Sequence, residues 1–170
     1  MAELMARMAE IAVSRHEGDV LVALGLGSCI GVALLDRASL VAGLAHVVLP
    51  ESRPGGATPG KFADTAVPEL LRQVTGLGGS AARLHAVLVG GAQMFSAGAS
   101  GALDIGRRNE QAVKAALAAA GIPVTTTLTG GNAGRTMRVH IGTGLVTCKQ
   151  AGSQEQTIAV RDAGRLRVAA

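Results

Sequence analysis

The chain has 170 residues, of which 48% are hydrophobic and 16% charged, a balance typical of a folded globular domain and not of a disordered chain. Trp and Tyr are absent and only two Phe occur, so the chain lacks the aromatic platforms on which single-stranded nucleic acids stack. The formal net charge is +4 without a long block of Lys and Arg, which argues against a nucleic-acid partner.

The N-terminal segment and the cysteines bear on the compartment. The first residues include charged side chains and contain no apolar stretch of signal-peptide length. No apolar run approaches the ~20 residues that a membrane-spanning helix needs. Cys29 and Cys148 are too few for a disulfide framework in a chain of this size. We therefore expect a cytoplasmic protein with reduced thiols and no membrane insertion.

The first third of the chain is expected to be mainly β-structure. Residues 1–16 have apolar residues near helical spacing, which predicts a short helix or a loosely held arm. Three short β-type runs follow, at 20–26, 29–36 and 40–50. Residues 51–60 contain two Pro and three Gly, which predicts a loop.

Helices and strands alternate in the rest. A helical pattern covers about 62–74, where Pro68 predicts a kink or a later start. The apolar run 84–92 predicts a buried central strand. After a loop, Asn109 is placed as the N-cap of an Ala-rich helix that Gly121 ends.

The C-terminal third predicts further strands, and no linker or repeat interrupts the chain. The expected strands are 122–129, 135–142 and 144–149, and residues 151–170 form a tail that either adds an edge strand or stays mobile. We therefore expect a single domain over 1–170 of the α+β class, with a mixed or antiparallel sheet covered by helices.

The segment LGLGSCIGVALLD (24–36) has two competing interpretations. Its glycines approximate a dinucleotide-binding loop, which requires G-x-G-x-x-G after a strand and at the start of a helix. Here Ile30 occupies the position of the third glycine, and β-type sequence follows instead of a helix. We therefore expect no nucleotide cofactor.

The second interpretation places the glycines around a reactive thiol. If 29–36 and 40–50 form a hairpin around a two-residue turn at 37–38, Cys29 lies directly opposite His46, within reach of a thiol–imidazole contact. A slip of one residue would place the two side chains on opposite faces.

A Cys–His pair of this kind would be suited to acyl transfer. The imidazole of His46 would convert the thiol of Cys29 into a nucleophilic thiolate. Gly27 and Ser28 would leave backbone N–H groups free to stabilise an oxyanion. The alternative is purely structural: a small buried Cys and a core His whose ring is satisfied by its neighbours.

Six segments together resemble the CheD family of chemoreceptor glutamine deamidases. They are LGLGSCIGVALLD, GLAHVVLPES, KFADTAVPELL, VGGAQMF, DIGRRN and GGNAGR…GTG, in the family's order over roughly residues 20–149. The resemblance implies hydrolysis of glutamine side-chain amides on methyl-accepting chemotaxis proteins, through a cysteine thioester. It implies Cys29 as nucleophile and His46 as general base. It also implies an α/β/α-type layered sandwich similar to the deamidase domain of the cytotoxic necrotizing factor toxins.

Two positions depart from the family's pattern. A Thr that commonly lies six residues before the nucleophile, and is the usual candidate for orienting the His, is Ala23 here. Either Ser28 or a backbone carbonyl must then orient His46, or activity is reduced. An acidic residue two positions before the later Gly-Gly is Leu128 here.

The resemblance also bears on partners. Family members can bind the CheC-type phosphatase and raise its activity toward phosphorylated CheY, so a catalytically weak adaptor of that phosphatase is the alternative function. A thiol redox sensor is a third possibility. Arg107 and Arg108 precede the second helix and are either solvated or in contact with an acidic receptor or partner surface. No metal-ligand spacing joins the remaining His residues, and we expect no cofactor and a monomer when free.

Overall fold

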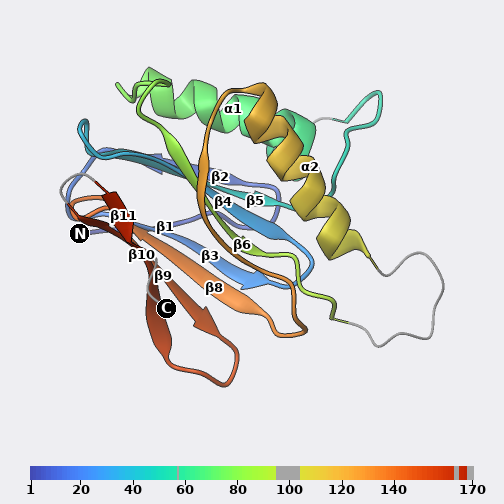
Figure 1. The fold of residues 1–170 in the computed structure, drawn as a ribbon. Helices are drawn as coiled ribbons and strands as arrows, with labels where there is room; N and C mark the ends of the chain where they lie inside the picture. Colours follow the sequence, from blue (N-terminus) through green and yellow to red (C-terminus); the bar gives the residue numbers. More distant parts are fainter. Residues whose placement is uncertain (57, 95–103, 163–164, 168–170) are drawn as a thin grey trace.

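The computed structural model describes residues 1–56, 58–94, 104–162 and 165–167. Two β-sheets and two helices make up this part of the chain (Figure 1). One sheet has the strand order β2-β5-β4-β6-β7 and the other β1-β3-β8-β9-β10-β11.

The first sheet consists of β2 (Ile11–Ser14), β5 (Val41–Val47), β4 (Ile30–Asp36), β6 (His85–Gly90) and β7 (Val124–Thr129). The second consists of β1 (Glu3–Met5), β3 (Val20–Leu26), β8 (Arg135–His140), β9 (Leu145–Gln150), β10 (Glu155–Asp162) and β11 (Arg165–Arg167). The helices are α1 (Ala63–Gly76) and α2 (Ile105–Ala119), and a short 3-10 turn, η1 (Pro59–Lys61), precedes α1. Neither described helix has the length and hydropathy that crossing a bilayer requires.

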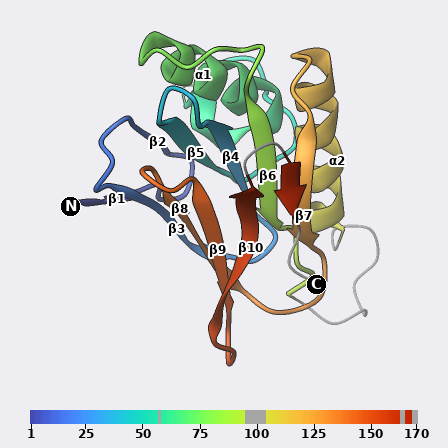
Figure 2. The ribbon, with the colours of Figure 1, turned by 60° about the vertical axis from the view of Figure 1, so that its left-hand side comes forward.

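The layers follow the order helices, first sheet, second sheet (Figures 1 and 2). Alternate residues of β4 face opposite ways: Ala33 and Leu35 join a cluster between the sheets, whereas Val32 and Leu34 join a cluster beneath the helices. The α+β class is confirmed, but the expected α/β/α order of layers is wrong. The second sheet occupies the place of a second helix layer. The alternating burial along β8 shows that this sheet buries one face against the first sheet.

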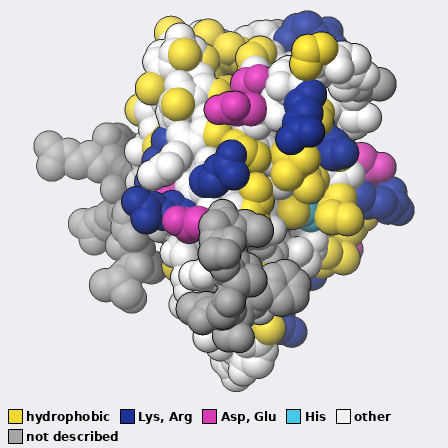
Figure 3. Space-filling view, turned by 90° about the vertical axis from the view of Figure 1, so that its right-hand side faces the viewer, with side chains coloured by type: hydrophobic (Ala, Val, Ile, Leu, Met, Phe, Trp, Pro, Cys, Tyr) yellow, Lys and Arg dark blue, Asp and Glu magenta, His cyan; other side chains and the backbone are white. Residues whose placement is uncertain are grey.

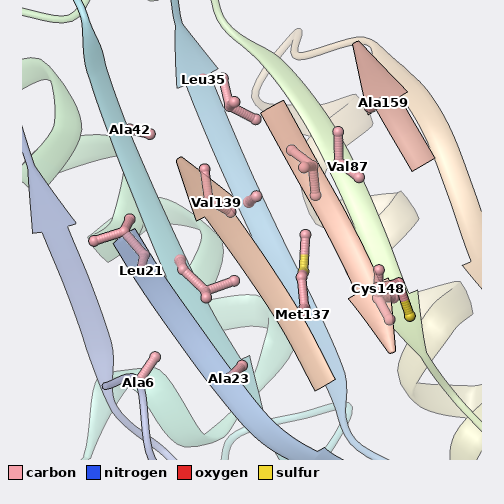
Figure 4. Close-up of a cluster of buried hydrophobic side chains, with 14 of the residues drawn as sticks. Ala6, Leu21, Ala23, Leu35, Ala42, Val87, Met137, Val139, Cys148 and Ala159 are labelled. Carbon is pink, nitrogen blue, oxygen red and sulfur yellow. The ribbon is translucent and has the colours of Figure 1, made fainter. Parts of the chain in front are cut away.

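The core between the sheets contains small aliphatic and sulfur-containing side chains. Figure 4 shows side chains from both sheets meeting there, among them Val87, Met137 and Cys148. Cys148 is 1% exposed and packs as a small buried side chain. With no large aromatic rings to fill the space, the two sheets pack closely through Ala, Val and Leu.

The N-terminal segment forms strands instead of the helix considered from its apolar spacing. β1 pairs in parallel with β3, and β2 pairs antiparallel with β5, so this segment contributes an edge strand to each sheet. Between the two strands, the N–H of Ala6 donates to the carbonyl of Val22 at 2.8 Å. Pairing with the free sheet edges outweighs the weak helical pattern. At the other end, the strand expected in the tail is present as part of β10, but it is not at the sheet edge, because β11 pairs with its other side.

The second helix starts earlier than expected. α2 begins at Ile105, and Asn109 lies inside it, fully buried, instead of capping it. Gly106 was expected in the preceding loop but lies in α2. A Cβ at this position would lie 2.6 Å from the carbonyl oxygen of Gly91. Glycine is needed there because the helix and the end of β6 approach each other closely. The first helix, α1, accommodates Pro68 within its length.

Candidate active site

β4 and β5 form the expected hairpin, but with a different register. Gly31, and not Cys29, pairs with His46. The predicted direct pairing of Cys29 with His46 is therefore wrong. The strands are separated by four residues, 37–40, instead of two. The side chain of Asp36 stabilises this longer turn by accepting hydrogen bonds from the Ala38 N–H (3.2 Å) and the Ser39 hydroxyl (3.1 Å).

The register shift is two residues, so Cys29 and His46 remain on the same face of the hairpin. Cys29 lies two residues before Gly31 and is a diagonal neighbour of His46, a relation in which Cβ atoms are typically about 7–8 Å apart or somewhat less. Cys29 belongs to the cluster between the sheets and is 8% exposed, while His46 is 2% exposed. The structure therefore brings the two candidate residues into one buried layer.

The bend between β3 and β4, which carries Cys29, is held by its carbonyl groups. The Gly27 carbonyl accepts from the Ala92 N–H at 2.8 Å, and the Cys29 carbonyl accepts from the Gly91 N–H at 2.9 Å. Gly90 permits this approach, since a Cβ there would lie 2.1 Å from the Cys29 carbonyl oxygen. The segment VGGAQMF thus has a physical role, because its backbone fixes the bend at both sides of the thiol.

Asn109 is the functional candidate that sequence reasoning misplaced. Its Nδ2 donates to the carbonyls of Ser28 and Val48, each at 2.9 Å, and so joins the residue before Cys29 to the strand end after His46. Its Oδ1 is buried and has no hydrogen-bond partner in the described part of the chain. The signal that could have revealed it is a polar residue on the buried face of α2, in line with Val113 and Leu117.

The backbone N–H groups of the bend differ in availability. The Gly27 N–H donates to the Gly25 carbonyl at 3.0 Å, so this expected donor is already engaged. The N–H groups of Ser28 and Cys29 donate to no other residue among those described. Gly27 instead provides space, because a Cβ there would lie 3.0 Å from Cγ of Met94. Donors for an oxyanion are therefore present at Ser28 and Cys29.

A backbone carbonyl orients the imidazole of His46. Nδ1 lies 3.2 Å from the carbonyl oxygen of Ala6. Since a carbonyl only accepts hydrogen bonds, Nδ1 carries the proton and Nε2 is the basic nitrogen. Of the two alternatives left by Ala23, Ser28 or a backbone carbonyl, the carbonyl makes this contact. Ala23 itself is buried between the sheets.

The N-terminal segment also holds the backbone of His46. The His46 N–H donates to the Glu10 carbonyl and the Ala9 N–H donates to the His46 carbonyl, both at 3.0 Å. Together with the Ala6 contact, residues 6–10 fix this residue by main chain and side chain. The segment expected as a loose arm is therefore part of the candidate site.

Burial keeps both reactive groups neutral. It lowers the pKa of His46, against the opposing effect of the Ala6 carbonyl. It also raises the pKa of Cys29, against the opposing effect of that residue's own N–H. Nε2 of His46 is buried without a hydrogen-bond partner among the described residues, so it forms no hydrogen bond with the thiol in this structure. Both pKa shifts favour a neutral thiol and a neutral imidazole over a thiolate–imidazolium pair.

The described residues contain no group of three or more His, Cys, Asp or Glu side chains that could hold a metal ion.

Comparisons with known proteins agree on one family. Residues 48–150 match the family described as CheD chemotactic sensory transduction. The chain is 45% identical over 141 residues to a probable chemoreceptor glutamine deamidase CheD from Desulforamulus reducens, covering 81% of this chain and 85% of the relative. It is 43% identical over 149 residues to the chemoreceptor glutamine deamidase CheD of Thermotoga maritima, covering 86% and 91%. A probable chemoreceptor glutamine deamidase CheD from Pyrococcus abyssi is 41% identical over 150 residues, covering 87% and 91%.

Proposed function

The chain belongs to the CheD family, and from this premise we propose that it hydrolyses the side-chain amide of glutamines on chemoreceptors to glutamate and ammonia. The names of the similar proteins support the reaction and the substrate class. The observation that carries the proposal for this chain is the presence of Cys29 and His46 in one buried layer, beside the N–H groups of Ser28 and Cys29.

We assign Cys29 as the nucleophile and His46 as the general base. Nε2 takes the thiol proton while the sulfur attacks the amide carbon, and the N–H groups of Ser28 and Cys29 stabilise the oxyanion. The imidazolium then returns the proton to the leaving nitrogen, so that ammonia departs and a thioester remains. Water attacks the thioester, His46 takes up its proton and returns it to the sulfur, and the glutamate product leaves.

Two further residues act by positioning this pair. Asn109 fixes the distance between the bend before Cys29 and the end of β5, and the carbonyl of Ala6 selects the His46 tautomer in which Nε2 is basic. A catalytically weak adaptor would fit an unoriented base, since Ala23 cannot orient His46, whereas the contact of His46 with the Ala6 carbonyl supports the hydrolase. Binding of a CheC-type phosphatase stays a prediction.

The wider expectations are proposals on the same basis. A cytoplasmic setting suits a nucleophilic thiol that must remain reduced. One domain over 1–170 is supported by a core cluster that receives side chains from both sheets. The likeness to the deamidase domain of the cytotoxic necrotizing factor toxins is supported only by the α+β class.

The test incubates a chemoreceptor cytoplasmic fragment with wild type, Cys29→Ala and Cys148→Ala, and follows Gln-to-Glu conversion by mass spectrometry. Wild type and Cys148→Ala should convert the fragment, whereas Cys29→Ala should be slower by at least ~1,000-fold. Cys148 is the matched control because it is also a buried cysteine in the same core cluster. Conversion by Cys29→Ala, or none by wild type on cognate receptors, would contradict the proposal.

A further inference from the structure

A cavity of about 500 Å³ lies where α1 and α2 both begin. Its lining includes Phe62, which precedes α1, and Ile105, the first residue of α2. The other lining residues are Leu49, Pro50, Glu51, Ser52, Arg53, Lys61 and Arg108. We call it the basic cavity, since its lining has three cationic side chains and one carboxylate. Figure 3 shows the side of the molecule on which α2 begins, with Lys and Arg side chains distributed over it.

The three cations come from three different segments and lack acidic partners. Arg53 lies in the loop after β5, Lys61 in η1 and Arg108 in the first turn of α2. None of them forms an ion pair with a carboxylate in the described part of the chain. Lys61 contacts the ring of Phe62 instead, 5.6 Å from its centroid. Among the described residues, the lining therefore has more positive than negative charge, with Glu51 against three cations.

The neighbouring charges are already engaged elsewhere. Arg107, next to Arg108, pairs with Asp104 at 3.5 Å. The carboxylate of Asp64, in the first turn of α1, accepts hydrogen bonds from the N–H and hydroxyl of Ser52 at 2.8–3.1 Å. These contacts hold the loop that carries Arg53, and Glu51 is the one acidic residue that lines the basic cavity among those that the structure describes.

The first turn of α2 adds to the positive potential. It contains no acidic residue but has Arg107 and Arg108. The N-cap residue of α2 is Asp104, and its carboxylate pairs with Arg107. Arg108 is therefore the first-turn cation that has no carboxylate partner in the described part of the chain.

The basic cavity adjoins the candidate active site through Asn109. Arg108 and Leu49 line the cavity, and their chain neighbours Asn109 and Val48 are joined by the 2.9 Å hydrogen bond described above. The same amide group of Asn109 holds the Ser28 carbonyl, one residue before Cys29. One side chain therefore joins the backbone next to the basic cavity to the backbone before Cys29.

We propose that the basic cavity binds the carboxylate of an acidic side chain on the substrate protein, near the glutamine that is hydrolysed. This inference rests on the proposed function. The volume of the basic cavity is within the range of small-ligand sites and accommodates a Glu or Asp side chain. Arg53 and Arg108 suit a carboxylate because a guanidinium donates two parallel hydrogen bonds to it.

The test compares receptor-derived peptides that contain one target Gln and differ only in having Glu or Ala at the flanking acidic positions. For wild type, kcat/KM should be about fivefold higher for the acidic peptide. In Arg108→Gln and in Arg53→Gln this ratio should fall toward one. Arg107→Gln is the matched control, since its guanidinium is adjacent in sequence but pairs outside the cavity, and it should keep the ratio. Raising the salt concentration should lower the wild-type ratio, since the cations are exposed.

A second readout is independent of turnover. Fluorescence anisotropy of labelled peptides with Cys29→Ala should show tighter binding of the acidic peptide, and adding Arg108→Gln should remove that preference. Preferential binding without any deamidation would support the basic cavity while defeating the proposed function. Deamidation with equal use of acidic and neutral peptides, or an equal loss of preference in Arg107→Gln and Arg108→Gln, would overturn the basic cavity as a carboxylate site.

Discussion

Buried polar groups are fully hydrogen-bonded at one end of β4 but not at the other. At its C-terminal end, Asp36 is 1% exposed and accepts hydrogen bonds from five donors, on Ala38, Ser39, Ser80 and Arg83, at 2.7–3.2 Å. At its N-terminal end, the thiol of Cys29 and Nε2 of His46 are buried without a bond between them.

The Asp36 end of β4 therefore serves fold stability, whereas we propose that the Cys29 end serves the chemistry. Burial alone would raise the pKa of Asp36, but hydrogen bonds from Arg83, Ser80 and Ser39 outweigh it and lower the value to about 2. That end is a satisfied network that fixes the turn. Unsatisfied buried groups at the other end cost stability, and the proposed function gives them a role, because a bound substrate would engage them.

The largest effect is expected from Asn109→Ala. This variant tests whether the side chains at the N-terminal end of β4 need precise positioning. Loss of the bonds to Ser28 and Val48 should lower kcat about 10- to 100-fold with little change in KM, because small displacements of reacting groups cost this much. Unfolding free energy should fall by about 1–3 kcal/mol. Both are measured well below the melting temperature, by deamidation kinetics and urea denaturation.

Val113→Ala provides the control for that variant. Val113 is buried on the same face of α2 and should lose about 2 kcal/mol through a small cavity while keeping kcat. Equal losses of kcat in the two variants would mean that Asn109 acts only through helix stability.

Asp36→Asn should affect the opposite end of β4 and leave the chemistry unchanged. We expect a loss of about 2 kcal/mol in unfolding free energy, since Arg83 is half exposed and contributes only part of the network. The folded pKa is lowered, so the stabilisation is present above pH 3.8 and is lost as the pH falls toward about 2. Urea titrations should show the largest gap between wild type and variant near neutral pH and convergence near pH 2. A kcat changed as much as in Asn109→Ala would erase the distinction between the two ends.

The smallest effect concerns the protonation of Cys29. Because burial raises its pKa above the ordinary 9.0, iodoacetamide should alkylate Cys29 at pH 7 at least about threefold more slowly than an unperturbed exposed thiol. The rate should keep rising above pH 9 without a plateau near pH 6–7. Measurement in a Cys148→Ala background assigns the signal to one thiol. A plateau near neutral pH would show a thiolate–imidazolium pair at rest.

Local patterns predicted most of the strands but not their register. The apolar run 84–92 contains β6, which is buried along nearly its whole length. The turn after β4 was predicted two residues too short, because the Asp36 side chain that bonds Ala38 and Ser39 within it is itself held by Ser80 and Arg83, 44 and 47 residues away in sequence. No window of sequence around the turn contains that information.

In the candidate site, too, local sequence indicated some of the residues, whereas those placed by long-range contacts could not be predicted. Cys29 and His46 could be selected from residue type and spacing, together with the family resemblance. Asn109 could not be placed, because Gly106 resembles a loop residue until the close contact with Gly91 is known. The Ala6 carbonyl was equally inaccessible, since it contacts His46 across 40 residues and leaves no side-chain pattern.

The contact between Ala6 and His46 has a consequence for how the site tolerates mutation. A main-chain oxygen is present whatever residue occupies position 6, so an alanine scan of the active site would leave this interaction intact and undetected. The orientation of the base depends instead on the path of the chain, which the pairing of β1 with β3 and of β2 with β5 maintains. Truncation of the first residues would therefore disturb the candidate active site while removing no side chain from it.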